Sequence, residues 1–160
     1  MVNRRNLARV HAAAGIIAWC LIASFFTGSL MSELLGSPSW VVLVKRTIFY
    51  TMWAMVLLVP LAALTGRKLA GKGHNVIIER KRRRMRWIAP NGLLLLTLGS
   101  YLYYKASQGQ FDPFFMGAQL VELAVGLTNL VLLGSMIRDG FRLKRLYQDQ
   151  LPQTHRPTLS

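Results

Sequence analysis

A run of basic residues between two long apolar segments limits what this chain can fold into. From Gly66 to Trp87, in GRKLAGKGHNVIIERKRRRMRW, lie nine of the chain's twenty Lys and Arg residues. So many charges cannot lie inside a lipid bilayer, whereas apolar segments of about 20 residues can cross one. Loops on the cytoplasmic side collect Lys and Arg. The run therefore predicts a membrane protein and assigns this side of it to the cytoplasm.

The composition fits that interpretation. Apolar residues make up 52% of the 160 residues, yet the formal net charge is +14. These values conflict in a soluble domain but not in a membrane protein whose charges are confined to its loops. A nucleic-acid-binding protein would carry its basic face on a soluble fold, so we expect no nucleic-acid partner. Cys20 is the single cysteine, which excludes an intrachain disulfide and a cysteine-based zinc cluster.

Four apolar segments predict an all-α fold, an integral membrane four-helix antiparallel bundle that forms a single domain over residues 1–149. The segments cover about residues 10–31, 40–64, 87–104 and 114–137. At about 1.5 Å per residue, their lengths suit a hydrocarbon core of about 30 Å. Residues 150–160 contain two prolines and many polar residues, and we expect them to form a disordered tail.

Local features refine these segments. A basic start before an apolar core also describes a signal peptide, but the first run exceeds the usual signal core and no A-x-A-like site follows, which favours a retained helix. Residues 32–39, SELLGSPS, predict a short outer turn. Pro60 is expected to kink the second helix near its inner end, because proline removes a backbone donor.

The distribution of Lys and Arg predicts the orientation. The N-terminal segment holds three, the central run nine and the C-terminal segment five, so seventeen of the twenty fall on one side and three on the other. This bias places both termini in the cytoplasm of a multi-pass protein of the cell inner membrane.

Ionisable residues within the apolar segments are costly in a bilayer and require partners. Lys45 and Arg46 in the second segment lie at nearly the same depth as Glu122 in the fourth. We predict that Glu122 pairs with Arg46 while Lys45 extends outward, with Lys45 as the partner if the helix is rotated by about 100°. The pair would lock the helices in register, or else line a polar cavity that binds a proton, an ion or a headgroup.

The fourth segment adds polar residues on the same face. Gln119, Glu122, Gly126 and Asn129 recur at spacings of three and four. Polar side chains on such a face often form hydrogen bonds between membrane helices. The predicted intramembrane polar cluster consists of Lys45, Arg46, Gln119, Glu122 and Asn129.

His11 lies at the inner end of the first segment, where a hydrogen-bonding role is the simpler interpretation. Its surroundings, RVHAAAG at residues 9–15, together with ERKRRRMRWIAP at residues 79–90, resemble the HemJ and CopD-like group of small bacterial membrane proteins. That group consists of helical bundles linked to haem or protoporphyrinogen chemistry and to copper handling. The resemblance implies haem as cofactor and His11 as its ligand. The chain departs from the group because no second histidine lies in an apolar segment.

Two functions follow as hypotheses. The first is a non-catalytic membrane partner or accessory subunit, which binds anionic phospholipid headgroups and another membrane protein or a second copy of itself. The second is a haem-binding redox membrane protein. The expected headgroup contacts are basic residues of the central run, since such clusters bind anionic lipid surfaces: Arg80, Lys81, Arg82, Arg83, Arg84 and Arg86.

Overall fold

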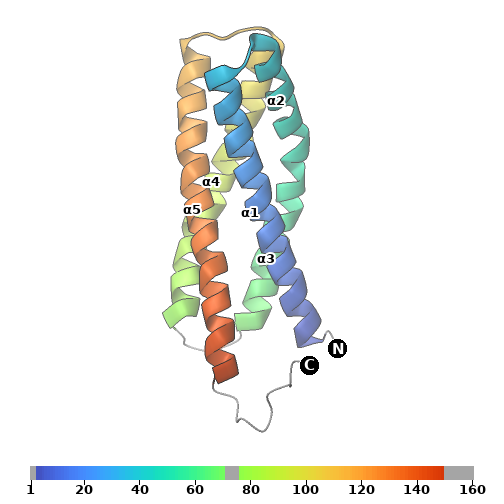
Figure 1. Cartoon of the computed structure of the whole chain (residues 1–160), viewed down its shortest axis with the longest axis vertical. Coiled ribbons are helices and arrows are strands. Elements are labelled where there is room, and N and C mark those ends of the chain that lie inside the picture. Colours follow the sequence, from blue (N-terminus) through green and yellow to red (C-terminus); the bar gives the residue numbers. More distant parts are fainter. Residues whose placement is uncertain (1–2, 71–75, 150–160) are drawn as a thin grey trace.

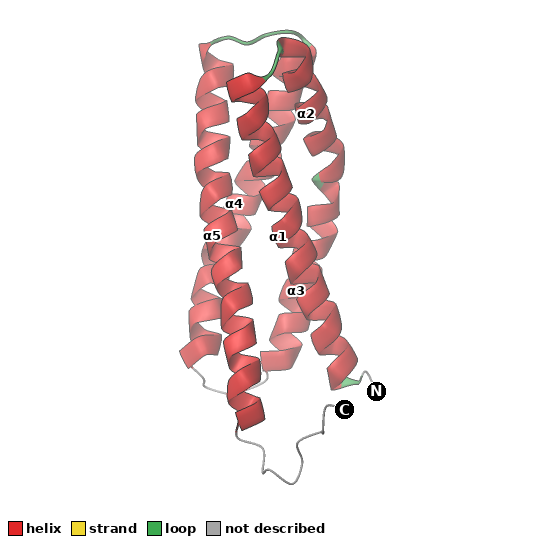
Figure 2. Ribbon diagram, viewed as in Figure 1, coloured by secondary structure: helices red, strands yellow, loops and turns green. Residues whose placement is uncertain are grey.

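The computed structural model of the protein describes residues 3–70 and 76–149. These residues form five helices, and no strand occurs among them (Figure 2). The helices are α1 (Arg4–Leu35), α2 (Pro38–Thr51), α3 (Trp53–Ala70), α4 (Val76–Ser107) and α5 (Pro113–Asp149). The expected all-α fold is confirmed, but the described helices number five because the expected second helix is divided. The expected tail at 150–160 lies outside the described residues.

The helices lie side by side in one elongated bundle (Figure 1). α1, α4 and α5 run along the bundle, and α2 followed by α3 forms the remaining column. One end of the bundle, here called the basic end, holds the start of α1, the end of α3, the start of α4 and the end of α5. The opposite end, here called the loop end, holds the connections at residues 36–37 and 108–112. Neighbouring columns therefore run antiparallel.

The expected second helix is divided between α2 and α3, eight residues before the expected kink at Pro60. The two helices are bent by 41° at Met52, whereas α3 continues through Pro60. At the break, the Met55 amide donates to the Met52 carbonyl at 2.9 Å, a tighter turn than an α-helix makes. The Phe49 ring stacks on Tyr103 of α4 at a centroid distance of 4.7 Å. Aromatic packing beside the break therefore accompanies a bend that no proline explains.

The basic run lies between two predicted membrane spans and is expected to form a loop, but the structure shows it to be mostly helix. Residues 66–70 end α3 and Val76 begins α4, so only residues 71–75 of the run lie outside the described part. Lys, Arg and Glu are good helix formers. The consecutive residues of these types at 79–84 therefore form the first, basic half of α4, which precedes its apolar half. α1 likewise continues to Leu35, through half of the expected outer turn.

The second connection at the loop end is fixed by side-chain and backbone bonds. Gly109 adopts a positive φ of 67°, a conformation that favours glycine. Asp112 Oδ1 accepts a hydrogen bond from the Phe115 amide at 2.9 Å and so caps α5. Lys105 Nζ forms an ion pair with Asp112 Oδ2. The end of α4 and the start of α5 are therefore held together in a defined turn.

Two helices are long and apolar enough to cross a membrane. They are α1 and residues 113–142 of α5, and the bent pair of α2 and α3 provides a third span if it is counted as one. α4 does not join them by this measure, because its first half is basic and its second half contains Asn91 and several tyrosines. The expectation of a membrane protein is thus supported by two or three helices of the described part.

The outer surface of the bundle is strongly apolar. Leu57 of α3 is 75% exposed, Leu93 of α4 is 67% exposed and Leu120 of α5 is 66% exposed. A compact apolar cluster lies near the loop end, where Val41, Leu102, Ala106 and Phe115 are buried together. Large apolar side chains turned outward on several helices suit a lipid environment.

Candidate functional site

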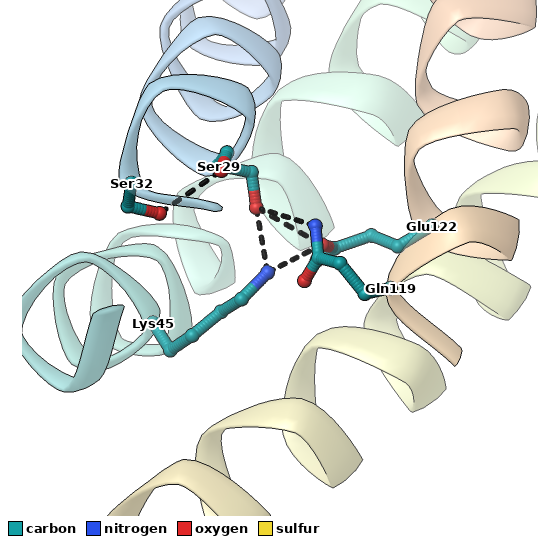
Figure 3. A network of polar contacts seen from close by, with 5 residues as sticks. All are labelled: Ser29, Ser32, Lys45, Gln119 and Glu122. Carbon is teal, nitrogen blue, oxygen red and sulfur yellow. Dashed lines mark hydrogen bonds and ion pairs between the residues drawn. The ribbon is translucent and has the colours of Figure 1, made fainter. Parts of the chain in front are cut away.

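A network of polar side chains lies inside the bundle near the loop end (Figure 3). Lys45 of α2, Ser29 of α1 and Glu122 of α5 meet there, with Gln119 one turn from Glu122. α2 buries Val41, Lys45 and Ile48, and these positions lie on one face of a helix. Lys45 therefore points into the bundle because it shares the packed face of α2. We call Ser29, Lys45, Gln119 and Glu122 the polar network.

An ion pair forms the centre of the polar network. Lys45 Nζ lies 2.6 Å from Glu122 Oε2, and the side chains are 0% and 11% exposed. Lys45 Nζ also donates to Ser29 Oγ at 2.6 Å. Both distances are those of charge-assisted or short hydrogen bonds. The ammonium thus has two bonds inside the protein.

Ser29 completes the pairing. Its hydroxyl donates to Glu122 Oε2 at 3.1 Å and accepts from Lys45, and Gln119 Nε2 approaches it at 3.4 Å. A hydroxyl has one proton to donate and two lone pairs that accept, so Ser29 uses its full capacity. A buried ion pair is tolerated when such bonds satisfy its charged atoms. Ser29 therefore connects α1 to the pair between α2 and α5.

The predicted pairing of Glu122 with Arg46 is wrong, and the alternative with Lys45 is confirmed. Arg46 is exposed, and the described ion pairs do not include it. Arg46 follows Lys45 directly, so it points about 100° away around α2. The rotation of α2 within the bundle decides which of the two bases reaches Glu122.

Of the other two predicted members of the cluster, one joins the polar network and the other does not. Gln119 is 2% exposed and joins the polar network. Asn129 is equally buried, but its Oδ1 has no hydrogen-bond partner among the described residues. It lies two turns from Glu122 towards the basic end, too far along α5 to reach Lys45. The structure thus brings Lys45, Gln119 and Glu122 together, and neither Arg46 nor Asn129 joins them.

Two residues near this site were missed by the sequence reading. Ser29 joins the polar network, and Glu33 follows it one turn later on α1. Glu33 lies close enough to Lys45 and Glu122 to interact with both electrostatically. A sequence pattern could have indicated them, because Ser32 and Glu33 follow Ser29 at spacings of three and four and so share one face of α1.

His11 joins α1 to α3 near the basic end. Its Nδ1 lies 2.9 Å from the Ala62 carbonyl oxygen and 3.2 Å from Thr65 Oγ1. A carbonyl oxygen only accepts, so the Nδ1 atom carries the proton. A Cβ atom on Gly66 would come within 2.9 Å of His11 Cε1, so the ring packs closely on α3. The expected hydrogen-bonding role of His11 thus has a defined geometry.

The structure gives His11 no described histidine as a second ligand. His74 and His155 lie outside the described residues. Within the described part, no group of three or more His, Cys, Asp or Glu residues is placed to hold a metal ion. Haem ligation by His11 stays a hypothesis that rests on the resemblance.

The arginines of the basic end differ in their surroundings. Arg84 Nη1 lies 2.6 Å from Asp139 Oδ2, and the Asp139 side chain is 5% exposed. Arg84 therefore joins α4 to α5, while its contact with a headgroup stays a prediction. Four other expected headgroup residues are exposed, and the Lys81 side chain lies outside the described part. The exposed residues are Arg80, Arg82, Arg83 and Arg86.

Comparison with known proteins identifies no relative whose properties could explain these sites. The polar network, the His11 bridge and the basic end are therefore interpreted from their own chemistry. No family model, no curated protein and no solved structure matches the chain.

Proposed function

We propose that the protein is a multi-pass, bacterial-type inner-membrane protein with four membrane-spanning columns and both termini in the cytoplasm, and that it acts as a non-catalytic membrane partner or accessory subunit. The separation of its charges carries the proposal. Between the two ends, the polar network and His11 join helices to one another. At the basic end, Arg80, Arg82 and Arg83 face outward.

The path of the chain supports four spans. α1 and α5 are each of membrane length, and α5 begins at the loop end. α4 packs along α5 and connects the basic end to the loop end. If α1 and α5 cross a bilayer, α4 crosses with them in spite of its lower hydropathy. Its polar residues Asn91 and Ser100 are half-buried within the bundle.

The charge distribution supports the orientation. Arg4, Arg5 and Arg9 begin α1, Arg67 and Lys68 end α3, and Arg138 and Arg142 lie in the last turns of α5. All of these positions belong to the basic end. Lys and Arg are retained on the cytoplasmic side of a membrane. The loop end would then face the periplasm.

The basic end is the surface that would meet a partner. Juxtamembrane arginines attract anionic phospholipid headgroups, with a gain of about 1 kcal/mol per charge near the surface. α4 and α5 have 32 and 37 residues, so they exceed a hydrocarbon core of about 30 Å by several turns. The excess extends the basic end beyond the lipid and offers it to an acidic surface of another membrane protein or of a second copy.

Labelling of single cysteines tests the topology. In a Cys20→Ser background, a membrane-impermeant maleimide is added to intact spheroplasts of cells carrying Ser37→Cys, Gln108→Cys, Arg5→Cys or Arg83→Cys. The first two variants should be labelled, and the last two only after the membrane is permeabilised. Labelling of Arg5→Cys in intact spheroplasts would contradict cytoplasmic termini.

Site-specific photo-crosslinking tests the role of partner. A photoreactive amino acid at Arg82 or Arg83 should crosslink the chain to one membrane protein or to itself, and Arg80→Glu with Arg86→Glu should reduce that yield. Native mass spectrometry of the same preparation should show bound anionic lipid that falls when Arg82 and Arg83 are neutralised. A crosslink pattern that contains lipid alone would contradict the accessory-subunit role.

An absorption spectrum separates this proposal from the haem hypothesis. The accessory-subunit role predicts that the detergent-purified protein lacks a Soret band. A Soret band that disappears in His11→Ala would support the haem-binding redox protein, because His11 is the ligand which the resemblance implies. Gly15→Ala, a change in open space on the same helix, is the matched control.

A further inference from the structure

A second carboxylate stands beside the ion pair of the polar network. Glu33 lies in the last turns of α1, is half-buried and interacts electrostatically with both Lys45 and Glu122. Its Oε1 atom is enclosed and has no hydrogen-bond partner among the described residues. A lone enclosed carboxylate oxygen without a donor is unusual, because such groups are normally hydrogen-bonded.

The charges around Lys45 do not balance. α1 contributes Glu33, α5 contributes Glu122 and α2 contributes Lys45, while Arg46 is exposed on another face of α2. Met52, between α2 and α3, and Gly99 of α4 approach the site without charge. The nearest charged base of α4, Lys105, is engaged with Asp112, and Tyr101, Tyr103 and Tyr104 are its other ionisable groups at this end. Two carboxylates therefore share one ammonium.

An unbalanced charge in this position is costly. The site lies inside a bundle whose outer surface is apolar, and ionised groups within a bilayer are stable only when paired. A half-buried carboxylate that shares its only cation with a second carboxylate takes up a proton more readily than a carboxylate in water does. One bound proton would leave the Lys45–Glu122 pair and a neutral acid, with no net charge.

A second orphaned acceptor points the same way. Gln119 is 2% exposed, and its Oε1 atom has no hydrogen-bond partner in the described part of the chain. Two enclosed acceptor atoms in or beside the polar network, Glu33 Oε1 and Gln119 Oε1, therefore lack donors among the described residues. A proton on Glu33 converts one of these acceptors into an O–H donor. A metal cation is disfavoured, because the Lys45 ammonium already occupies the site and repels it.

We propose that Glu33 and the polar network form a proton-binding site, in which Glu33 holds one proton that it exchanges with the solution at the loop end. Uptake converts the Glu33 carboxylate to the neutral acid, and release to water returns its negative charge. Release would leave two anions around Lys45 and would weaken the packing of α1 on α2 and α5. The proposal rests on the proposed membrane placement, which cysteine labelling tests separately.

Infrared spectroscopy of the full chain in nanodiscs tests this site, since a protonated carboxyl group has its own carbonyl band. The chain has only six Asp and Glu residues. At neutral pH the wild type should show the band of one carboxylic acid, and Glu33→Gln should lose it while keeping the thermal midpoint. Glu79→Gln, an exposed acid of the basic end, should keep the band.

Two further variants keep the test decisive if Glu33→Gln fails to fold. Glu122→Gln leaves one carboxylate for Lys45, so Glu33 should ionise and the band should disappear. Lys45→Met leaves two carboxylates without a base, so the band should roughly double as both acids become protonated. A wild type without the band, or a band that survives both Glu33→Gln and Glu122→Gln, would overturn the proposal. A band that appears only when sodium is removed would assign the site to a metal cation and would overturn it too.

Discussion

The loop end and the basic end of this bundle use charge in opposite ways. Near the loop end, Lys45 is fully enclosed and its charge is matched by Glu122 within the protein. At the basic end, most arginines face outward, and Arg84 is the one of α4 that pairs with a described acid. The same types of residue therefore join helices in one region and remain mostly exposed in the other.

The difference follows from what surrounds each charge. A charge enclosed by apolar helices is stable only with a counter-charge inside the protein, whereas a charge in water or among headgroups is already solvated. The loop end thus fixes the mutual rotation of three helices. The charges of the basic end are left free for the proposed roles, orientation in the membrane and contact with a partner.

The largest effect is expected from separating Lys45 from Glu122. Lys45→Met should destabilise the protein by about 3 kcal/mol because it leaves a buried acid unpaired. Glu122→Gln should cost less, since Glu33 can replace the lost carboxylate. The double variant should recover part of the larger loss. Thermal unfolding in detergent measures all three.

Arg46→Gln is the matched control for that comparison. It removes the same charge from the adjacent, exposed position of α2, so its midpoint should stay close to that of the wild type. If Arg46→Gln is as harmful as Lys45→Met, the two ends do not differ in the way described.

The next largest effect is expected at the His11 bridge. A methyl group on Gly66 would meet the imidazole ring at 2.9 Å, so Gly66→Ala should displace the ring and break its bond to Ala62. Overpacking of this kind costs about 1–3 kcal/mol. Gly92→Ala adds the same methyl group to a helix position with open space around it and should be neutral or slightly stabilising. Equal midpoints for the two variants would show that α1 is not held to α3 here.

A smaller effect is expected at the pair that joins α4 to α5. Arg84→Gln leaves Asp139 enclosed without its ion pair and should cost about 1 kcal/mol, the upper range of partly exposed pairs. Arg83→Gln, at the exposed neighbouring position, should leave stability unchanged but reduce binding to anionic vesicles. Chemical denaturation and vesicle co-sedimentation separate the two effects. The comparison fails if both variants behave alike in both measurements.

The smallest effect is expected from Asp112. Bonds from Lys105 and from the Phe115 amide hold the pKa of its carboxyl below the ordinary value. A lowered folded-state pKa adds stability at pH values above the unfolded-state pKa, and that stability is lost as the pH falls through the lowered value. The midpoint of the wild type should thus exceed that of Asp112→Asn at neutral pH and converge with it in acid. A difference that persists at low pH would mean that the cap acts without its charge.

The sequence predicts at what depth the residues of the site lie and which of them share a helix face. It predicts little about which residues of different helices meet. The depth of Lys45 and Glu122 follows from counting residues, and the face shared by Gln119 and Glu122 follows from their spacing. Ser29 and Glu33 were missed because small or terminal polar residues are common near helix ends. The bend at Met52 could not be predicted, because local rules do not include the packing of Phe49 on Tyr103.

The sequence by itself determined the all-α class, the apolar segments and the concentration of basic residues at one end, because each depends on composition and on distance along the chain. Only the tertiary structure decided that Lys45 and not Arg46 reaches Glu122. A membrane helix is apolar on all sides, so Val41 and Ile48 mark one face of α2 as packed while Val42 and Phe49 mark the adjacent face equally well. The choice between those faces is made by the helices that pack against them.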